Sequence, residues 1–228
     1  ASMKHGKNYK NALAKYDSAA SYELPKAVDI VKELKYAKFD ETVEVHVSLT
    51  LGKGQSVRDT LVLPHQFRGE KKVLVFCTDD RVKEALDAGA AYAGSTEYIE
   101  KVKGGWLDFD IAVATPDMMK DVGRLGMVLG RRGLMPNPKT GTVTTDIASA
   151  INELKKGRVE FRADKGGVVH LPVGKVSMDS SKIAENVQAL INETMRKKPA
   201  DAKGDYIRSV SISSTMGPGV WVDYKVGE

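Results

Sequence analysis

The sequence has few of the residues that build metal sites, disulfides or membrane spans. Its single cysteine, Cys77, excludes an internal disulfide and a multi-cysteine zinc site, and it fits a reducing cytosol. The four histidines, at positions 5, 46, 65 and 170, do not have metal-ligand spacing. Aromatic residues make up only 7% of the chain, and no apolar run approaches the roughly 20 residues of a membrane-spanning helix. We therefore expect no metal and no membrane association, and we expect no export because no apolar leader opens the chain.

Motifs for nucleotide binding and catalysis are also missing. Neither G-x-x-x-x-G-K-[ST] nor G-x-G-x-x-G follows a strand-like segment. The carboxylates of Asp79 and Asp80, just after the first buried run, would repel a pyrophosphate. Asp108 and Asp110 form a carboxylate pair, but the sequence places no catalytic partner beside them. We predict a non-enzymatic protein without a cofactor, and an α/β enzyme that binds a nucleotide stays as the alternative.

The excess of positive charge is small. The 228 residues carry a net charge of +5, which favours an anionic partner without establishing one. The charge is spread along the chain, with about +2 in residues 1–66, +1 in 67–156 and +2 in 157–228. A nucleic-acid site would therefore be a local arrangement of side chains. A protein-interaction scaffold with incidental basicity is a further alternative.

Hydrophobic patterning differs between the ends of the chain and its middle. Residues 43–49 alternate apolar and polar side chains, as do 159–162 and 209–213, which is typical of strands with one face in solvent. A second strand at 57–63 is expected to pair with 43–49 as a hairpin. Residues 73–77 and 111–114 are continuous apolar runs, typical of strands buried on both faces, and helical segments separate them.

This contrast predicts a discontinuous domain interrupted by an inserted one. The outer domain would comprise residues 1–66 and 157–228. The inserted domain would comprise residues 67–156 and form a small parallel α/β unit. The chain would cross twice between them, near Gly69 and Gly157, which makes these glycines candidate hinge residues. Three serial domains are the alternative.

Three regions have the residue types of an RNA contact. Residues 123–141 hold five glycines and the basic side chains of Arg124, Arg131, Arg132 and Lys139, so they predict either a rigid phosphate-binding loop or a plain connection. Phe39 could stack on an unpaired base, although packing under the preceding helix end is the stronger interpretation from the residues alone. The loop around Thr215, Met216 and Gly217 could contact ribose hydroxyls, or be an ordinary turn. The set of Arg162, Lys165, His170 and Ser209 could form a basic face or an ordinary solvent face.

Several motifs resemble one known family. They are KFDETVEVH at 38–46, LPH at 63–65, AVATPD at 112–117, GLMPNPK at 133–139, VGK at 173–175 and TMGP at 215–218. In their order and spacing, from about residue 4 to residue 223, they resemble the family of ribosomal protein L-one, the protein of the mobile stalk on the bacterial large subunit.

The resemblance implies a fold and a set of partners. The fold is a split α/β sandwich with an antiparallel sheet, interrupted by an inserted three-layer Rossmann-like domain that binds no cofactor. The partners are large-subunit ribosomal RNA, exit-site tRNA, whose deacylated form the stalk helps to release, and the protein's own messenger RNA, whose translation it represses. A cytoplasmic location on the ribosome, no membrane partner and a monomeric free state are also implied.

The family's RNA site falls on the outer domain of this chain. Position by position it corresponds to Lys38, Phe39, Glu41, Thr42, Arg162, Lys165, His170, Ser209, Thr215, Met216 and Gly217. The sequence departs from the family pattern in three places. The loop at 51–58 is short and lacks an acidic-proline-Arg-Arg stretch, Arg131 replaces a proline, and Gly166 replaces a polar residue.

Overall fold

The computed structural model describes residues 4–200, 202 and 204–224, and the chain divides into two compact units. The outer unit is formed by residues Ala1–Phe67 and Phe161–Glu228, and the inserted unit by Arg68–Glu160. The expected fold class is confirmed, because one unit holds a largely antiparallel sheet with helices and the other a parallel sheet between helices.

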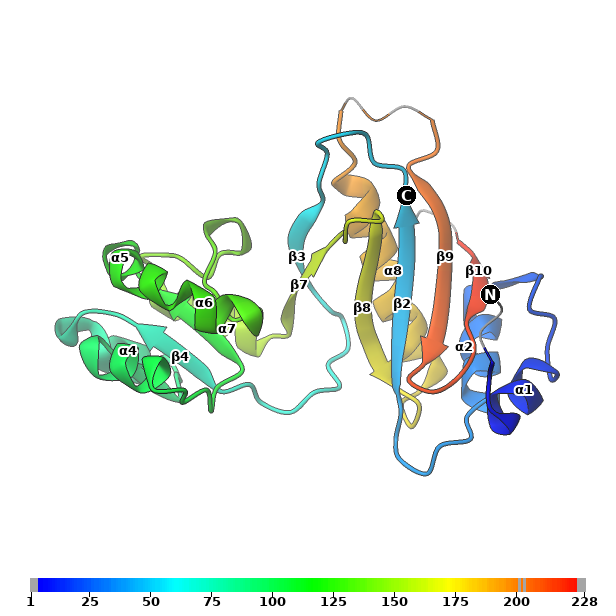
Figure 1. Ribbon diagram of the computed structural model, residues 1–228, viewed down its shortest axis with the longest axis horizontal. Helices are drawn as coiled ribbons and strands as arrows, with labels where there is room; N and C mark the ends of the chain where they lie inside the picture. The colour runs from blue at the N-terminus through cyan, green and yellow to red at the C-terminus, as the bar shows by residue number, and fades with distance from the viewer. Residues whose placement is uncertain (1–3, 201, 203, 225–228) are drawn as a thin grey trace. The chain divides into compact units, whose positions relative to one another are not determined.

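The outer unit is built on a five-stranded sheet with the strand order β1-β10-β9-β2-β8 (Figure 1). Strands β1 and β10 run parallel, and the other neighbouring pairs run antiparallel. The strands are β1 (Ser21–Glu23), β2 (Thr42–Leu49), β8 (Val168–Lys175), β9 (Ile207–Ser214) and β10 (Val220–Asp223). The helices are α1 (Lys7–Leu13), α2 (Leu24–Glu33) and α8 (Ser180–Arg196).

Alternating side chains divide the outer sheet into a covered face and an open face. Along β2 the valines at 43, 45 and 47 are buried, whereas the intervening polar residues are partly exposed. Helices α2 and α8 pack on the covered face, and both contribute buried apolar residues such as Val28 and Ile183 (Figure 1). The opposite face keeps its polar side chains in solvent, as the alternation predicted. We call it the open face.

The expected hairpin between residues 43–49 and 57–63 is wrong. Strand β3 (Arg58–Val62) pairs with β7 (Arg158–Arg162) in a separate two-stranded sheet, and β2 lies between β8 and β9. Both edges of β2 are thus occupied by strands distant in sequence. The eight residues between β2 and β3 give no tight turn of the two-residue type that fixes a hairpin register.

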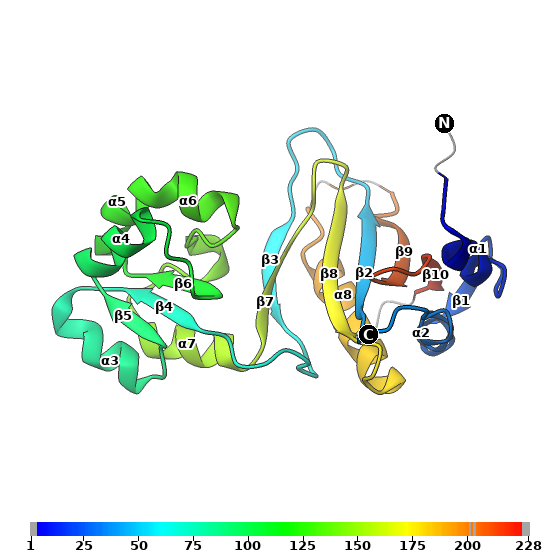
Figure 2. The same cartoon turned by 60° about the horizontal axis from the view of Figure 1, so that its bottom comes forward.

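The inserted unit has three layers around the parallel sheet β5-β4-β6 (Figure 2). Alternate residues of β4 point to opposite sides: Val73 and Val75 pack with α3 and α7, while Leu74 and Phe76 pack with α4, α5 and α6. The elements are β4 (Val73–Phe76), α3 (Val82–Asp87), β5 (Tyr92–Gly94), α4 (Thr96–Lys103), β6 (Ile111–Ala114), α5 (Met119–Val122), α6 (Gly126–Arg131) and α7 (Ile147–Lys155).

The segment at 123–141 is more regular than the loop expected from its glycines and prolines. It contains a 3-10 helix (Gly123–Leu125), helix α6 and a second 3-10 helix (Pro138–Thr140). Leu125 and Leu129 are buried in the core beside Val122, so helical spacing of apolar residues overrides the low helix propensity of glycine. Within the described part of the chain, no helix is long and apolar enough to cross a membrane.

Candidate RNA interface

Two loops that are far apart in sequence meet at one end of the outer sheet (Figure 1). The loop between α2 and β2 carries Phe39, and the loop between β9 and β10 carries Met216. The hydroxyl of Tyr36 donates to the Met216 carbonyl, and the Met216 amide donates to Oε1 of Glu41 at 2.8 Å. Both ends of the first loop are therefore tied to the second. Phe39 and Met216 themselves are exposed by 53% and 49%.

The second contact between the loops is a pair of threonines. The Thr42 amide donates to Oγ1 of Thr215 at 3.2 Å, and this hydroxyl in turn lies 3.3 Å from the Thr42 carbonyl. Lys175, directly across from Thr42 on β8, donates from Nζ to Oγ1 of Thr42 at 2.8 Å. The threonine hydroxyls are thereby held in fixed positions beside an ammonium group.

Asp40 anchors the Phe39 loop to the turn after β8. Its carboxylate accepts hydrogen bonds from the Ser177 amide at 3.0 Å and from the Ser177 hydroxyl at 2.7 Å. The hydroxyl bond is the largest cause that lowers the pKa of Asp40, so the carboxylate stays ionised in the native state. Hydrogen bonds thus fix both residues that follow Phe39, Asp40 to the turn after β8 and Glu41 to the Met216 loop.

The resemblance places Glu41 among the RNA contacts, and this assignment stays a prediction. The Glu41 side chain is fully buried. It supports the loop by accepting the Met216 amide. Among the described residues, Oε2 of Glu41 and Oγ of the adjacent buried Ser214 have no hydrogen-bond partner. Glu41 contacts Met216 and Ser214 lies against Gly217, so both polar atoms without a partner are packed next to the Thr215–Gly217 loop.

The open face carries a pair of histidines in directly opposite register. His46 on β2 faces His170 on β8, and their Nδ1 atoms are 2.8 Å apart. Nε2 of His46 also lies 3.2 Å from the Ser213 hydroxyl. Burial lowers the pKa of His46, and the nearby His170 lowers it further, which favours a neutral imidazole at this position. The two Nδ1 atoms are within hydrogen-bond distance of each other, so the two rings are held together on the open face.

The basic residues Arg162 and Lys165 lie at the other end of the outer unit, around the turn between β7 and β8, and both are exposed. Asp164 shapes this turn by accepting the amides of Gly166 and Val168. Its other oxygen lies 3.1 Å from Nε2 of His170 on the open face. These bonds, the Val168 amide foremost, lower the pKa of Asp164. The basic turn is therefore fastened to the open face.

The structure thus brings the predicted outer residues together in two groups on one unit. Lys38, Phe39, Thr42 and the Thr215–Gly217 loop form the first group at one end of the sheet. Arg162, Lys165 and Ser209 mark the other end, since Ser209 pairs with Ser48 at the far end of β2. His170 lies between the groups. Thr42 and Ser48 are six residues apart on one strand, or roughly 20 Å at the usual rise of a β-strand. We call this surface the platform.

The basic residues predicted as a second contact lie on the inserted unit. Arg124, Arg131, Arg132 and Lys139 are all exposed. Nη1 of Arg124 lies 3.6 Å from Oδ1 of Asp121, and this ion pair partly neutralises the charge of the arginine. Arg131 is the last residue of helix α6. Lys139 belongs to the second 3-10 helix, where its amide donates to the side chain of Asn137. They are separate surface cations on a helical segment, and their part in binding stays a prediction.

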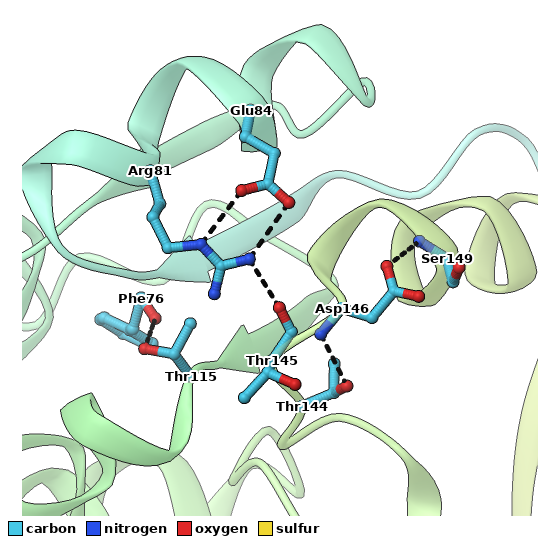
Figure 3. Close-up of polar contacts among 8 residues, drawn as sticks. All are labelled: Phe76, Arg81, Glu84, Thr115, Thr144, Thr145, Asp146 and Ser149. Atoms are coloured by element: carbon cyan, nitrogen blue, oxygen red, sulfur yellow. Dashed lines mark hydrogen bonds and ion pairs between the residues drawn. The ribbon is translucent and has the colours of Figure 1, made fainter.

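At the carboxyl edge of the parallel sheet, where an α/β fold would bind a nucleotide, polar groups of the protein bond to one another (Figure 3). Arg81 makes an ion pair with Glu84 and donates to the Thr145 carbonyl. Asp146 caps helix α7 by accepting the Ser149 amide at 3.1 Å. Cys77 is fully buried next to this edge, and burial raises the pKa of its thiol, so it is a core residue and not a nucleophile.

Comparison with known proteins identifies the fold and its relatives. The model of the ribosomal protein L1p/L10e family matches residues 31–218. The chain belongs to this family. The large ribosomal subunit protein uL1 of Treponema pallidum (strain Nichols) is 67% identical over 226 residues, which are 99% of this chain and 100% of that protein. The protein of the same name from Borrelia hermsii (strain HS1 / DAH) is 56% identical over 221 residues, 97% of this chain and 99% of its own.

Membership of the L1p/L10e family confirms the resemblance that the motifs suggested. It also confirms the expectation of a structural ribosomal protein and not an enzyme, which removes the alternative of a nucleotide-dependent α/β enzyme. As a ribosomal protein of this family, it works on the ribosome in the cytoplasm.

The two candidate hinge glycines of this L1p/L10e protein differ in conformation. Gly157 has φ of 94°, and its amide bonds to the Leu154 carbonyl just past the end of α7, so helix termination explains a glycine there. A Cβ atom built on Gly69 would meet no atom within 4 Å. Neither observation tests a hinge, which stays a prediction for both residues.

Several residues that hold the platform together were not predicted from the sequence. Tyr36, Asp40 and Ser177 form hydrogen bonds over long sequence distances, and no local pattern signals such partners. The exposed Trp221 on β10 could have been found, because it lies between Val220 and Val222 in a strand of alternating burial.

Proposed function

We propose that this chain is a protein of the large ribosomal subunit that binds subunit RNA through the platform of its outer unit. The observation that supports this most is the set of hydrogen bonds that joins the Phe39 loop to Met216. They present an aromatic ring and a thioether, each about half exposed, beside threonine hydroxyls that are already fixed. The names of its relatives, which are large-subunit proteins, agree with this role.

The chemistry of the platform suits folded RNA more than a regular duplex. Unpaired bases stack on aromatic side chains, and hydroxyl and backbone groups bond to the ribose 2′-OH, which distinguishes RNA from DNA. Phe39 supplies the ring, and Thr42 and Thr215 supply hydroxyls. Arg162 and Lys165 supply exposed cations for phosphates at the far end. With few cations involved, the preorganised shape of the platform carries much of the specificity.

We extend the proposal to the ribosome and to regulation. Bound at the stalk of the large subunit, the protein would assist release of deacylated tRNA from the exit site. It would also repress translation of its own messenger RNA by binding a similar RNA structure with the same platform. Because one surface serves both RNAs, ribosomal RNA should displace the messenger, and free protein accumulates on the messenger only when ribosomal sites are filled.

A nuclease footprint on total large-subunit RNA tests the proposal directly. We expect one protected region, and we expect affinity to fall linearly with the logarithm of salt concentration with a small slope, since few phosphates are neutralised. Heparin at the same charge concentration should compete poorly. Protection spread over the whole RNA, or equal competition by heparin, would contradict specific recognition and favour incidental polyanion binding.

A panel of variants locates the site on the outer unit. Met216→Ala and Thr215→Val should each weaken binding to the protected RNA by about 1–3 kcal/mol, because each removes a contact or a fixed hydroxyl from the platform. Lys139→Ala, on the inserted unit, is the comparison variant and should weaken binding of this RNA less than either of them. Equal losses for all three variants would move the site off the platform.

A further inference from the structure

We propose that Trp221 is an additional RNA-stacking residue, which extends the platform across the open face of the sheet to strand β10. The proposal rests on the proposed RNA-binding function and names a contact that the platform residues do not include. The chain has only two tryptophans, and this one is 43% exposed although it lies within a regular strand.

The strand register places Trp221 in line with the histidine pair. Reading directly across the sheet from β1 to β8, cross-strand partners form the row Ser21, Trp221, Ser211, His46 and His170. Directly opposite residues of neighbouring strands point to the same face. The indole therefore lies on the open face, two strands from His46, or roughly 10 Å at the usual spacing between strands.

No aromatic side chain of the described residues packs against the indole of Trp221. Its neighbours in the row are serines, which do not cover an indole, and Val220 and Val222 are buried on the other face. The other tryptophan, Trp106, contrasts with it because it packs against Tyr92, Tyr98 and Phe109 in the inserted unit. Among the described residues no such ring contact involves Trp221.

Charge across the open face indicates which part of a nucleotide meets the ring. Asp223 and its partner Glu23 lie two residues further along β10 and β1, so a phosphate is disfavoured near this edge. The cations Arg162, Lys165 and Lys175 lie on or beside β8, at the opposite edge of the sheet. A strand of RNA crossing the face would thus place its phosphates toward β8 and a base on Trp221. Sheet faces that carry exposed aromatics bind RNA by such stacking.

Fluorescence and affinity together test the inference. In the variant Trp106→Phe, Trp221 is the only indole, and we expect its emission to be quenched when large-subunit RNA is added. In Trp221→Phe, the emission of Trp106 should stay unchanged on RNA addition. Trp221→Ala should bind the RNA roughly 5- to 150-fold more weakly, which corresponds to the stacking of one base. Trp221→Phe should retain most of the affinity, because a phenyl ring also stacks.

The outcomes separate this inference from the proposed function. If the unchanged protein gives its footprint but Trp221→Ala binds equally well with an unquenched indole, the inference is wrong and the function stands. If the unchanged protein gives no footprint, the function fails and the inference fails with it. If Trp221→Ala binds naked RNA normally but enters large-subunit particles poorly, the ring contacts a protein neighbour, which also overturns the inference. Thermal unfolding should be unchanged in both Trp221 variants.

Discussion

The substitution Gly217→Ala probes how tightly the Thr215–Gly217 loop is packed. A Cβ atom at this position would lie 2.5 Å from Oγ of Ser214, about 0.9 Å inside ordinary van der Waals contact, which begins at 3.4 Å. The backbone of Gly217 is not in the left-handed region, so alanine meets no conformational strain there. Within the protein, the effect of the substitution therefore comes from the contact with Ser214.

The size of the effect follows from overpacking. Extra methyl groups in a packed site cost about 1–3 kcal/mol, and relief of this contact requires a shift of the loop that carries Met216 or of Ser214 itself. We expect Gly217→Ala to weaken binding to large-subunit RNA by about tenfold, or 1.4 kcal/mol. Filter binding or fluorescence titration measures the affinity, and thermal unfolding checks that the fold is retained.

A second substitution should reverse the first. Ser214→Ala removes the clashing oxygen and leaves the Ser214 Cβ at 3.7 Å, an ordinary contact. Alone it should be nearly neutral, because the hydroxyl is buried without a hydrogen-bond partner among the described residues. The double variant should return to within about threefold of the original affinity. A double variant as weak as Gly217→Ala would refute the packing argument and indicate that the methyl group obstructs the RNA itself.

Three further outcomes follow from buried groups. Asn186 donates to the carbonyls of His65 and Val173 and accepts a hydrogen bond from the His65 amide. Asn186→Ala should therefore lower the free energy of unfolding, measured by urea titration, by about 3 kcal/mol or more. A loss below about 1 kcal/mol would contradict these hydrogen bonds. Because the pKa of His46 is lowered, the unfolded chain binds more protons near pH 6.5, so stability should fall as pH drops through that value, and His46→Gln should flatten the fall in urea midpoints; an unchanged slope would count against it. Cys77 should resist a thiol reagent until urea unfolds the chain, and rapid modification of the native protein would show that it is accessible.

Local patterns predicted the elements that bury regular faces. The alternation in β2 records one face in contact with a core, and the apolar runs of β4 and β6 record burial on both faces. The two strands that the patterns missed, β1 and β5, are only three residues long, too short for a period to show. The partner of β3 was wrong because strand pairing depends on the whole sheet, and a sequence window sees only adjacent segments.

The candidate site was less accessible to sequence reasoning, for a different physical reason. The resemblance placed Glu41 among the RNA contacts, whereas the structure buries its carboxylate, which accepts a hydrogen bond from the Met216 amide 175 positions away. Such long-range bonds decide whether a polar residue faces solvent or supports a loop. The glycine-rich segment shows the opposite error, since buried Leu125 and Leu129 make part of it helical despite its composition.

The affinity of Phe39→Ala for large-subunit RNA tests the central claim most directly. The ring is 53% exposed, so its loss should leave thermal unfolding unchanged while binding weakens by about 1–3 kcal/mol, the usual contribution of one stacked base. Val62→Ala, which truncates an apolar side chain of 51% exposure in the same unit, is the matched control and should bind normally. A Phe39→Ala variant that binds RNA as well as the control but unfolds more easily would show that the ring is a packing residue, and it would contradict the platform.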